Sequence, residues 1–152
     1  MKFIIRRGEV KDARSLHNFN ITLQKEMHDL FKKTSLKEFA KAQLCDPKAY
    51  TVKDYEGWLS GMNGKIDSQL NNIWYVVESD NKVVGEIYAE IKERKGMQIK
   101  KVGYIDSLYI SKKYRNKGYA SMLVERIMKW FKEKNVTNVS LDVDIVNTSA
   151  KR

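Results

Sequence analysis

Cysteine and proline are almost absent from this sequence, and their scarcity narrows the class of protein. The 152 residues hold one cysteine, Cys45, which excludes an internal disulfide and a cysteine-based metal site. One proline and eight glycines are too few for a fibrous or disordered chain. No apolar run approaches the roughly 20 residues that cross a bilayer. The basic residues at the start are not followed by the apolar stretch of a signal peptide, so we expect none. We therefore expect one soluble, cytoplasmic domain over residues 1–152 with no membrane partner.

Acidic residues are also scarce relative to basic ones. Lysine and arginine number 29 against 19 aspartate and glutamate, which gives a net charge of +10. This balance favours an anionic partner, but the lysines are spread along the chain, so a solvated Lys-rich surface accounts for it equally well. The sequence contains no recognition helix, zinc pattern or aromatic-basic RNA-binding motif, and we expect no nucleic-acid partner.

Hydrophobic periodicity predicts an ordered series of helices and strands. Apolar residues recur every three or four positions over 10–30 and 118–134, which is typical of amphipathic helices. A shorter helix begins at Ser35 and ends before Pro47, and another begins at Thr51 or Asp54 and extends to Met62. Apolar or alternating runs predict strands at residues 2–6, 73–78, 82–91, 98–111 and 139–144. The order predicts a mixed α/β sheet, an antiparallel meander followed by a βαβ crossover, with helices on both faces.

The segment RNKGYA, residues 115–120, carries the clearest chemical signal. It joins a predicted strand end to a helix N-terminus, where unpaired backbone N–H groups bind phosphate. Gly118 removes a side chain where the backbone must approach the anion, and Ala120 stays small. Four cations surround the segment: Lys112, Lys113, Arg115 and Lys117. Neither a P-loop nor the three-glycine dinucleotide fingerprint occurs, so the phosphate ligand is of another kind.

Placed between this strand and helix, the stretch 105–123 (IDSLYISKKYRNKGYASML) resembles the acetyl-CoA motif of the GNAT superfamily of N-acetyltransferases. In that motif Arg/Gln-x-x-Gly-x-Gly/Ala follows a Leu-x-Val-like strand end. The opening IIRRGEVKDARSL, the hairpin VVESDNKVVGEIY and the segment LDVDIVNTSA agree in order, and Asn147 and Ala150 match the family's Asn-x-x-Ala. The resemblance covers nearly the whole chain.

The resemblance implies acetyl-CoA as co-substrate and no metal. The strand carrying Leu108, Tyr109 and Ile110 is expected to bulge and to splay from 139–144, so that pantetheine pairs with its backbone like an extra strand. Asn147 is expected to contact the pantetheine arm from the far side. The pyrophosphate is expected on the amides of Arg115, Asn116, Lys117, Gly118, Tyr119 and Ala120.

The family's reaction is direct attack of a primary amine on the thioester through a tetrahedral intermediate. A backbone N–H near Ile110 is expected to stabilise the oxyanion. A base must take the amine proton, and Asp106 is the leading candidate, although a satisfied surface carboxylate is an equal interpretation. Glu86 and Glu90 are weaker candidates that share one strand face with Tyr88.

The acceptor and the general acid are not identified by the sequence. The acceptor is a small-molecule or protein amine, such as a polyamine, an aminoglycoside-like antibiotic, an amino acid, or a protein N-terminus or lysine. Asp54, Tyr55 and Trp58 are expected to touch it, while Trp130 falls off its helix stripe and is expected at a contact surface. In the family a tyrosine protonates the leaving thiolate and a final strand pair covers the sheet edge, and both would fall past Arg152 here. Three explanations account for their absence from the sequence: truncation, a homodimer that covers the strand edge, or a non-catalytic acyl-CoA-binding module.

Overall fold

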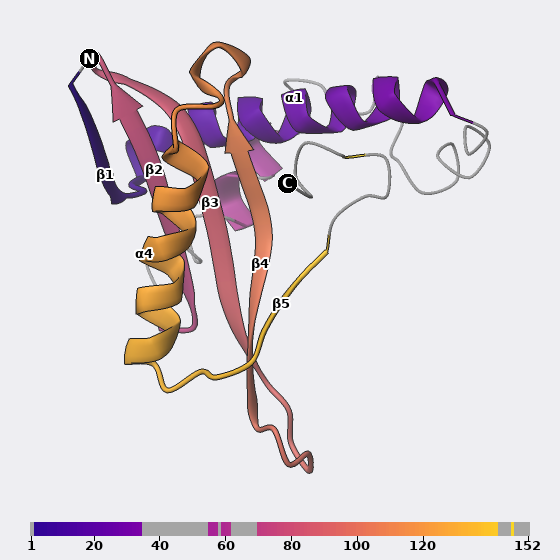
Figure 1. Ribbon diagram of the computed structural model, residues 1–152, viewed down its shortest axis with the longest axis vertical. Coiled ribbons are helices and arrows are strands. Elements are labelled where there is room, and N and C mark those ends of the chain that lie inside the picture. Colours follow the sequence, from indigo (N-terminus) through magenta and orange to yellow (C-terminus); the bar gives the residue numbers. More distant parts are fainter. Residues whose placement is uncertain (1, 35–54, 58, 62–69, 143–146, 148–152) are drawn as a thin grey trace.

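The computed structural model describes residues 2–34, 55–57, 59–61, 70–142 and 147 (Figure 1). The strands are β1 (Phe3–Arg7), β2 (Asn72–Ser79), β3 (Lys82–Glu93), β4 (Lys101–Ile110) and β5 (Val139–Leu141). The helices are α1 (Ala13–Lys32) and α4 (Tyr119–Glu133), with 3-10 turns at Val10–Asp12 and Lys112–Tyr114. Residues 55–57 and 59–61 are helical, in agreement with the predicted helix there, whereas the helix predicted between Ser35 and Pro47 lies outside the described residues.

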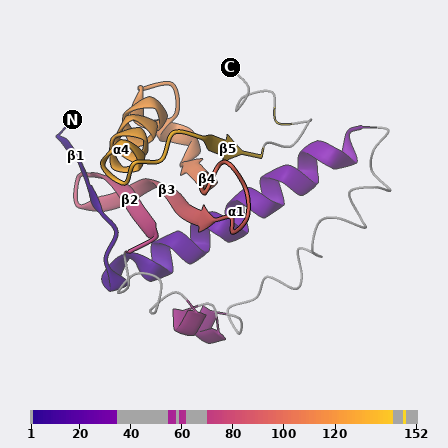
Figure 2. The same cartoon turned by 90° about the horizontal axis from the view of Figure 1, so that it is seen from below.

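The five strands form one mixed sheet in the order β1-β2-β3-β4-β5. The first four pair antiparallel with their sequence neighbours, and β5 pairs parallel with β4 after the crossover through α4. The helices α1 and α4 lie on opposite faces of the sheet (Figure 2). The predicted mixed α/β class, meander plus crossover, is therefore confirmed.

The main core lies between the sheet and α4. Leu123, Ile127 and Phe131 of α4 are buried against apolar residues of β2, β3 and β4. Trp130 is also buried in this cluster, 3% exposed, so the expectation that it marks a contact surface is wrong. Gly103 of β4 is required here, because a Cβ on it would lie 2.5 Å from the Phe131 ring. The close approach seats α4 directly on β4, the strand that carries the predicted site.

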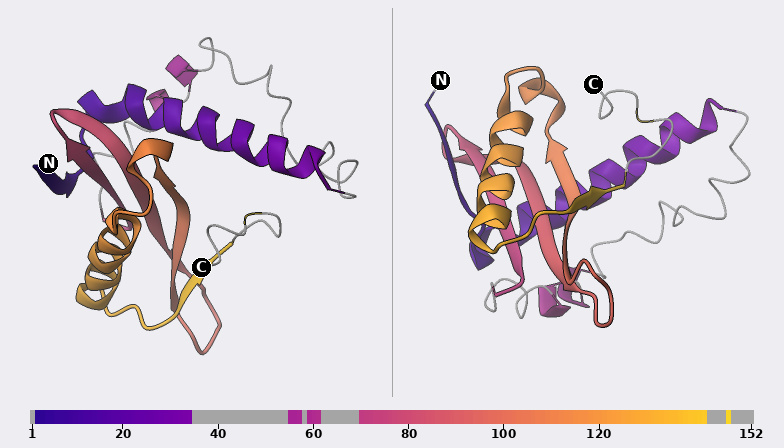
Figure 3. Two further views of the ribbon diagram at one scale, coloured as in Figure 1. Left: turned by 45° about the horizontal axis from the view of Figure 1, so that its top comes forward. Right: turned by 60° about the horizontal axis from the view of Figure 1, so that its bottom comes forward.

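A polar cluster fixes the start of α1 against the opposite side of the sheet. Arg6 of β1 donates to both carboxylate oxygens of Asp12, at 2.7 and 2.9 Å, and to Glu78 of β2 at 2.8 Å. Glu9 and Asp12 form a reciprocal capping box ahead of the helix. From this anchor α1 runs across the sheet and contacts β3 and β4 (Figure 3).

Candidate active site

The strands β4 and β5 pair over only part of the length of β4. Within the described residues, β5 pairs with Gly103, Tyr104 and Ile105 through Val139, Ser140 and Leu141. In Figure 1 the two strands meet near the lower end of the sheet and diverge toward its upper end. The splay predicted for these strands is therefore present, and it leaves the C-terminal half of β4 unpaired on that side across the described residues.

A β-bulge lies at the point where β4 leaves β5. Tyr88 of β3 pairs with Ser107, but the adjacent Ala89 pairs with Ile105, so Asp106 is an extra residue in β4 that faces no register partner on β3. A bulge bends its strand and increases the local twist. The predicted base is exposed at this bend, directly after the last β4 residue that pairs with β5.

The pairing register determines which backbone groups of β4 face the open side. Ser111 N–H donates to Val84 O at 2.9 Å, which makes the opposed residues Gly85 and Ile110 a non-hydrogen-bonded pair. The N–H and C=O of Ile110 therefore point away from β3. Because the pattern alternates along an antiparallel ladder, Leu108 presents its backbone in the same direction. These are the two residues predicted to pair with pantetheine.

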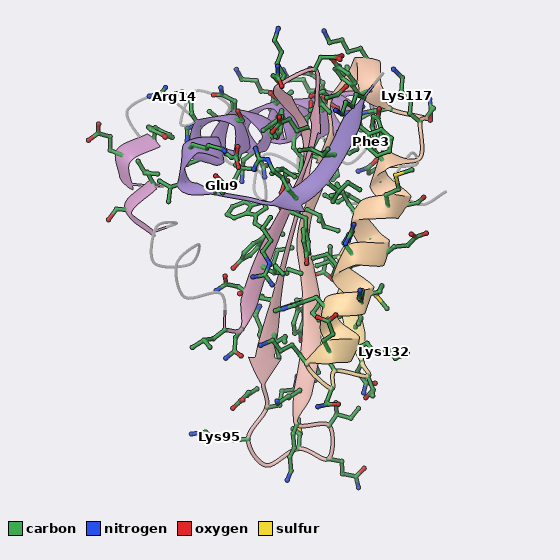
Figure 4. The ribbon with its side chains drawn as sticks, turned by 90° about the vertical axis from the view of Figure 1, so that its left-hand side faces the viewer. Phe3, Glu9, Arg14, Lys95, Lys117 and Lys132 are labelled. Carbon is green, nitrogen blue, oxygen red and sulfur yellow. The ribbon has the colours of Figure 1, made fainter. Side chains whose placement is uncertain are left out.

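A pocket of about 680 Å³ lies beside this open edge. Its walls come from the C-terminal half of α1, the end of β4, the following 3-10 turn and the first turn of α4. Of the predicted site residues, it is lined by Leu108, Tyr109, Ile110, Arg115, Asn116, Gly118, Tyr119, Ala120 and Asn147. Lys117 is exposed near the end of the sheet opposite Lys95 (Figure 4), and neither Lys117 nor Asp106 lines the pocket.

The loop before α4 adopts left-handed backbone at two positions. Asn116 has φ 60° and Gly118, the residue that caps α4, has φ 80°. A Cβ on Gly118 would meet only the Met122 methyl carbon at 3.9 Å, so the glycine is needed for its conformation rather than for space. Among the described residues no side chain caps the helix, and the N–H groups of its first turn lack acceptors within the helix. Such a concave run of amides attracts anions.

Sequence reasoning missed Glu26 of α1, which reaches the same pocket. Its carboxylate accepts hydrogen bonds from the Arg115 guanidinium at 2.8 Å and the Tyr109 hydroxyl at 3.1 Å. Lys112 Nζ lies 3.9 Å from it. Arg115 also donates to the Ile110 carbonyl at 2.8 Å. No sequence motif marks Glu26, because its partners lie more than 80 positions away and meet it only through the path of α1.

A second carboxylate, Glu86, lies in the middle of the sheet on the α1 side. It is buried and accepts hydrogen bonds from Trp74 Nε1 at 2.7 Å and Ser107 Oγ at 3.1 Å. Burial raises the pKa of Glu86 to about 7, although both hydrogen bonds favour the charged form. Because Ser107 directly follows the bulge at Asp106, this carboxylate joins three strands at the bend of β4.

Tyr88 and Glu90 continue the same face of β3, as predicted. Trp74 packs on the Tyr88 ring with centroids 4.8 Å apart. Burial, and then the charges of Glu90 and Asp106, raise the pKa of Tyr88 to about 12. Glu90 itself binds Lys92 Nζ at 2.6 Å. The three candidate carboxylates therefore gather along one side of the sheet around the bulge.

The profile described as "Acetyltransferase (GNAT) family" matches residues 27–152. The chain belongs to this family. No curated protein matches the sequence. A GCN5-related N-acetyltransferase from Ralstonia eutropha JMP134 superposes with a TM-score of 0.74 at 14% identity, covering 99% of this chain and 89% of that one. A predicted acetyltransferase with acetyl-CoA from Clostridium acetobutylicum gives 0.67 at 16% identity, covering 97% and 85%. Glucosamine-6-phosphate N-acetyltransferase from Arabidopsis thaliana gives 0.67 at 20% identity, covering 99% and 88%.

The residues present in this GNAT chain fit an acyl-CoA. An extended pantetheine arm requires backbone donors and acceptors at one strand edge. Leu108 turns its N–H and C=O to the pocket and Ile110 turns its N–H there, while the Ile110 carbonyl accepts from Arg115. A diphosphate requires converging amides, which the left-handed Asn116 and Gly118 and the start of α4 provide. Both features border one continuous pocket, in the order in which they occur along coenzyme A.

In the described part of this GNAT chain, no three His, Cys, Asp or Glu side chains come together where they would hold a metal ion. Within the same ranges, no helix has the length and apolar character of a membrane span.

Of the residues predicted to touch the acceptor, Tyr55 is described. It packs on His17 with ring centroids 5.2 Å apart, and the Arg14 guanidinium lies over its ring at 4.3 Å from the centroid. Asp54 and Trp58 lie outside the described residues.

Proposed function

We propose that this protein transfers the acetyl group of acetyl-CoA to a primary amine of a small molecule or a protein. One observation carries the proposal: the outward-facing backbone of Leu108 and Ile110 opens into a pocket that ends at the left-handed cap of α4. The family and the fold support acetyl transfer, and the Clostridium acetobutylicum neighbour was solved with acetyl-CoA. The amine acceptor is what the family resemblance implies, and the carboxylates around the bulge support it.

On the donor side, the pantetheine arm lies along the open edge of β4 and pairs with its backbone as a neighbouring strand would. The amides from Asn116 to Ala120 bind the diphosphate, and Lys112 and Lys117 add positive charge at the pocket and at its rim. Asn147, which also lines the pocket, contacts the pantetheine arm. Backbone groups do most of this binding, so a charged or bulky side chain in the loop is expected to interfere with it.

On the acceptor side, a neutral amine attacks the thioester carbon. The C–N bond forms first and gives a tetrahedral intermediate, and the C–S bond breaks when that intermediate collapses. The Ile110 N–H, aimed into the open edge, stabilises the negative charge that develops on the thioester oxygen. The amine proton passes to Asp106, directly or through a water molecule, and the thiolate leaves with the remainder of coenzyme A.

Geometry favours Asp106 over the other two carboxylates as the base. Asp106 is exposed at the bulge, next to the opening of the strands. Glu86 is buried and its carboxylate is committed to Trp74 and Ser107. Glu90 lies opposite Tyr104, within the part of β4 that pairs with β5, and is therefore further from the opening of the strands. The charges of Glu90 and Asp106, both felt at Tyr88, attract a protonated amine toward the bulge before its proton is removed.

Calorimetry and a thiol-release assay together test the proposal. Coenzyme A is titrated into the folded protein, and thiol release from acetyl-CoA is followed with spermidine, tobramycin, glycine and an Nα-acetyllysine amide. We expect saturable binding and turnover that depends on one class of amine. Binding without turnover for every amine would support a non-catalytic acyl-CoA-binding module instead, and the absence of any binding heat would overturn the proposal.

A further inference from the structure

The Arg115 side chain is turned toward the protein rather than toward the loop that it begins. Its Nε donates to the Ile110 carbonyl at 2.8 Å and its Nη2 donates to Glu26 Oε2 at 2.8 Å. The guanidinium also lies over the Tyr109 ring, 5.5 Å from the centroid. A planar guanidinium with two of its edges engaged in this way is fixed in orientation, and the adjacent carboxylate offsets its charge.

Glu26 holds both residues that flank the Ile110 N–H. The peptide that carries this N–H joins Tyr109 to Ile110. Glu26 accepts from the hydroxyl of Tyr109 at 3.1 Å, and through Arg115 it restrains the carbonyl of Ile110. The Glu26 side chain is 15% exposed, which makes its ion pair with Arg115 less screened than a surface pair.

We propose that Glu26 and Arg115 form a latch that positions the Ile110 N–H for acetyl transfer, and that the Arg115 side chain does not bind the diphosphate of acetyl-CoA. The inference rests on the proposed function and assigns both residues as positioning residues. Ser111 N–H, bonded to Val84 O at 2.9 Å, fixes the strand on the β3 side. The latch supplies the matching restraint on the open side, where no strand pairs with Ile110 in the described part of the chain.

The physical reason for a latch is that, among the described residues, no strand pairs with the end of β4 on its open side. A strand paired on both edges is held by two ladders of hydrogen bonds, whereas in this part of the chain the end of β4 has a ladder with β3 on one side and the pocket on the other. An oxyanion donor is effective only when it is held in place before the charge develops. A small shift of the Ile110 peptide would leave cofactor binding almost unchanged and would slow the chemical step.

Two acetyl-group donors, acetyl-CoA and the shorter S-acetylpantetheine, distinguish positioning of the Ile110 N–H from diphosphate binding. S-acetylpantetheine carries the same thioester as acetyl-CoA and lacks the diphosphate. For Glu26→Gln and Arg115→Gln, assayed with the amine that wild type uses best, we expect kcat to fall roughly tenfold with both donors. We expect the Kd for coenzyme A to stay within about twofold of wild type, and the double variant to be no slower than either single variant. Arg115→Lys, which keeps the charge and loses the planar fork, is expected to be as slow as Arg115→Gln.

Glu125→Gln and Arg126→Gln serve as matched controls, because they make the same charge changes on the exposed surface of α4 away from the pocket. Thermal unfolding confirms that each variant is folded, and Arg115→Lys carries the test if Glu26→Gln does not fold. A Kd for coenzyme A weakened tenfold or more, with slowing confined to acetyl-CoA, would overturn the inference. An unchanged kcat in folded latch variants would do so as well. Failure of wild type to bind coenzyme A would instead overturn the proposed function.

Discussion

At the scale of single residues, the site depends on backbone conformation more than on side-chain chemistry. Asn116 and Gly118 turn the loop through left-handed conformations, and the register of β4 turns the amides of Leu108 and Ile110 outward. The sequence motif therefore marks where the chain must bend. Side chains act in support, as the bonds from Arg115 to Ile110 and Glu26 illustrate.

Gly118→Ala tests the loop conformation. With φ at 80°, any L-residue at this position is strained by about 1–2 kcal/mol, although the added methyl group meets open space. We expect the Kd for coenzyme A to rise several-fold by calorimetry, because the loop relaxes away from its bound shape. Gly96→Ala is the control: φ there is 78°, the space is also open, and the residue lies in the β3–β4 hairpin. It should lower stability similarly and leave the Kd unchanged. A wild-type Kd in Gly118→Ala would contradict the assigned loop.

Asp106→Asn tests the base at the bulge. The amide cannot accept the amine proton, so we expect kcat to fall at least roughly tenfold, while the Kd for coenzyme A stays near that of wild type. The rate is measured from pH 6 to 9 with the best amine acceptor. Full activity across that range would remove Asp106 from this role and return attention to Glu90.

Glu86 makes the stability of the protein depend on pH. Its pKa is raised by burial from 4.5 to about 7, so the folded state binds the proton more tightly than the unfolded state. The free energy of unfolding therefore falls by roughly 3 kcal/mol as the pH rises from about 4.5 to about 7. Above this range it changes little. Urea unfolding of wild type and Glu86→Gln is compared at pH 5 and pH 8. The variant should lack the fall in unfolding free energy that Glu86 causes between these two pH values. An equal dependence on pH in wild type and variant would contradict the assignment.

At the scale of elements, periodicity predicted most of the described strands and both long helices, because each has one apolar face to bury. The order of pairing was also predicted, but the residue-by-residue register was not. A bulge in β4 was expected only from the family resemblance, and nothing in the periodicity places it at Asp106, since its position depends on how β3 and β4 fit together. Trp130 was assigned to the wrong face, although it follows Leu123 by seven positions, the spacing of one helical stripe.

The contact between α4 and β4 provides a test at this scale. In Gly103→Ala the new Cβ would lie 2.5 Å from the Phe131 ring, so the helix must shift away from the strand. We expect a loss of about 1–3 kcal/mol in urea unfolding. Gly103→Ala combined with Phe131→Leu should recover part of that loss, because the smaller side chain leaves room for the methyl group. A fully stable single variant would contradict the packing described for this interface.

At the scale of the whole molecule, the site is a junction between layers. The helix α1 on one face supplies Glu26, α4 on the other face supplies the amides, and β4 between them supplies the open edge (Figure 3). The net charge of +10 agrees with a polyanionic co-substrate, but the charge alone does not locate its binding site. The dimer across the outer edge of the sheet stays a prediction.

The most direct test of the central claim is a crystal structure of the protein with coenzyme A. We predict that the pantetheine arm lies along β4, hydrogen-bonded to the backbone of Leu108 and Ile110, with the diphosphate on the amides between Asn116 and Ala120. Coenzyme A bound elsewhere, or an empty β4 edge in crystals grown at saturating ligand, would contradict the account.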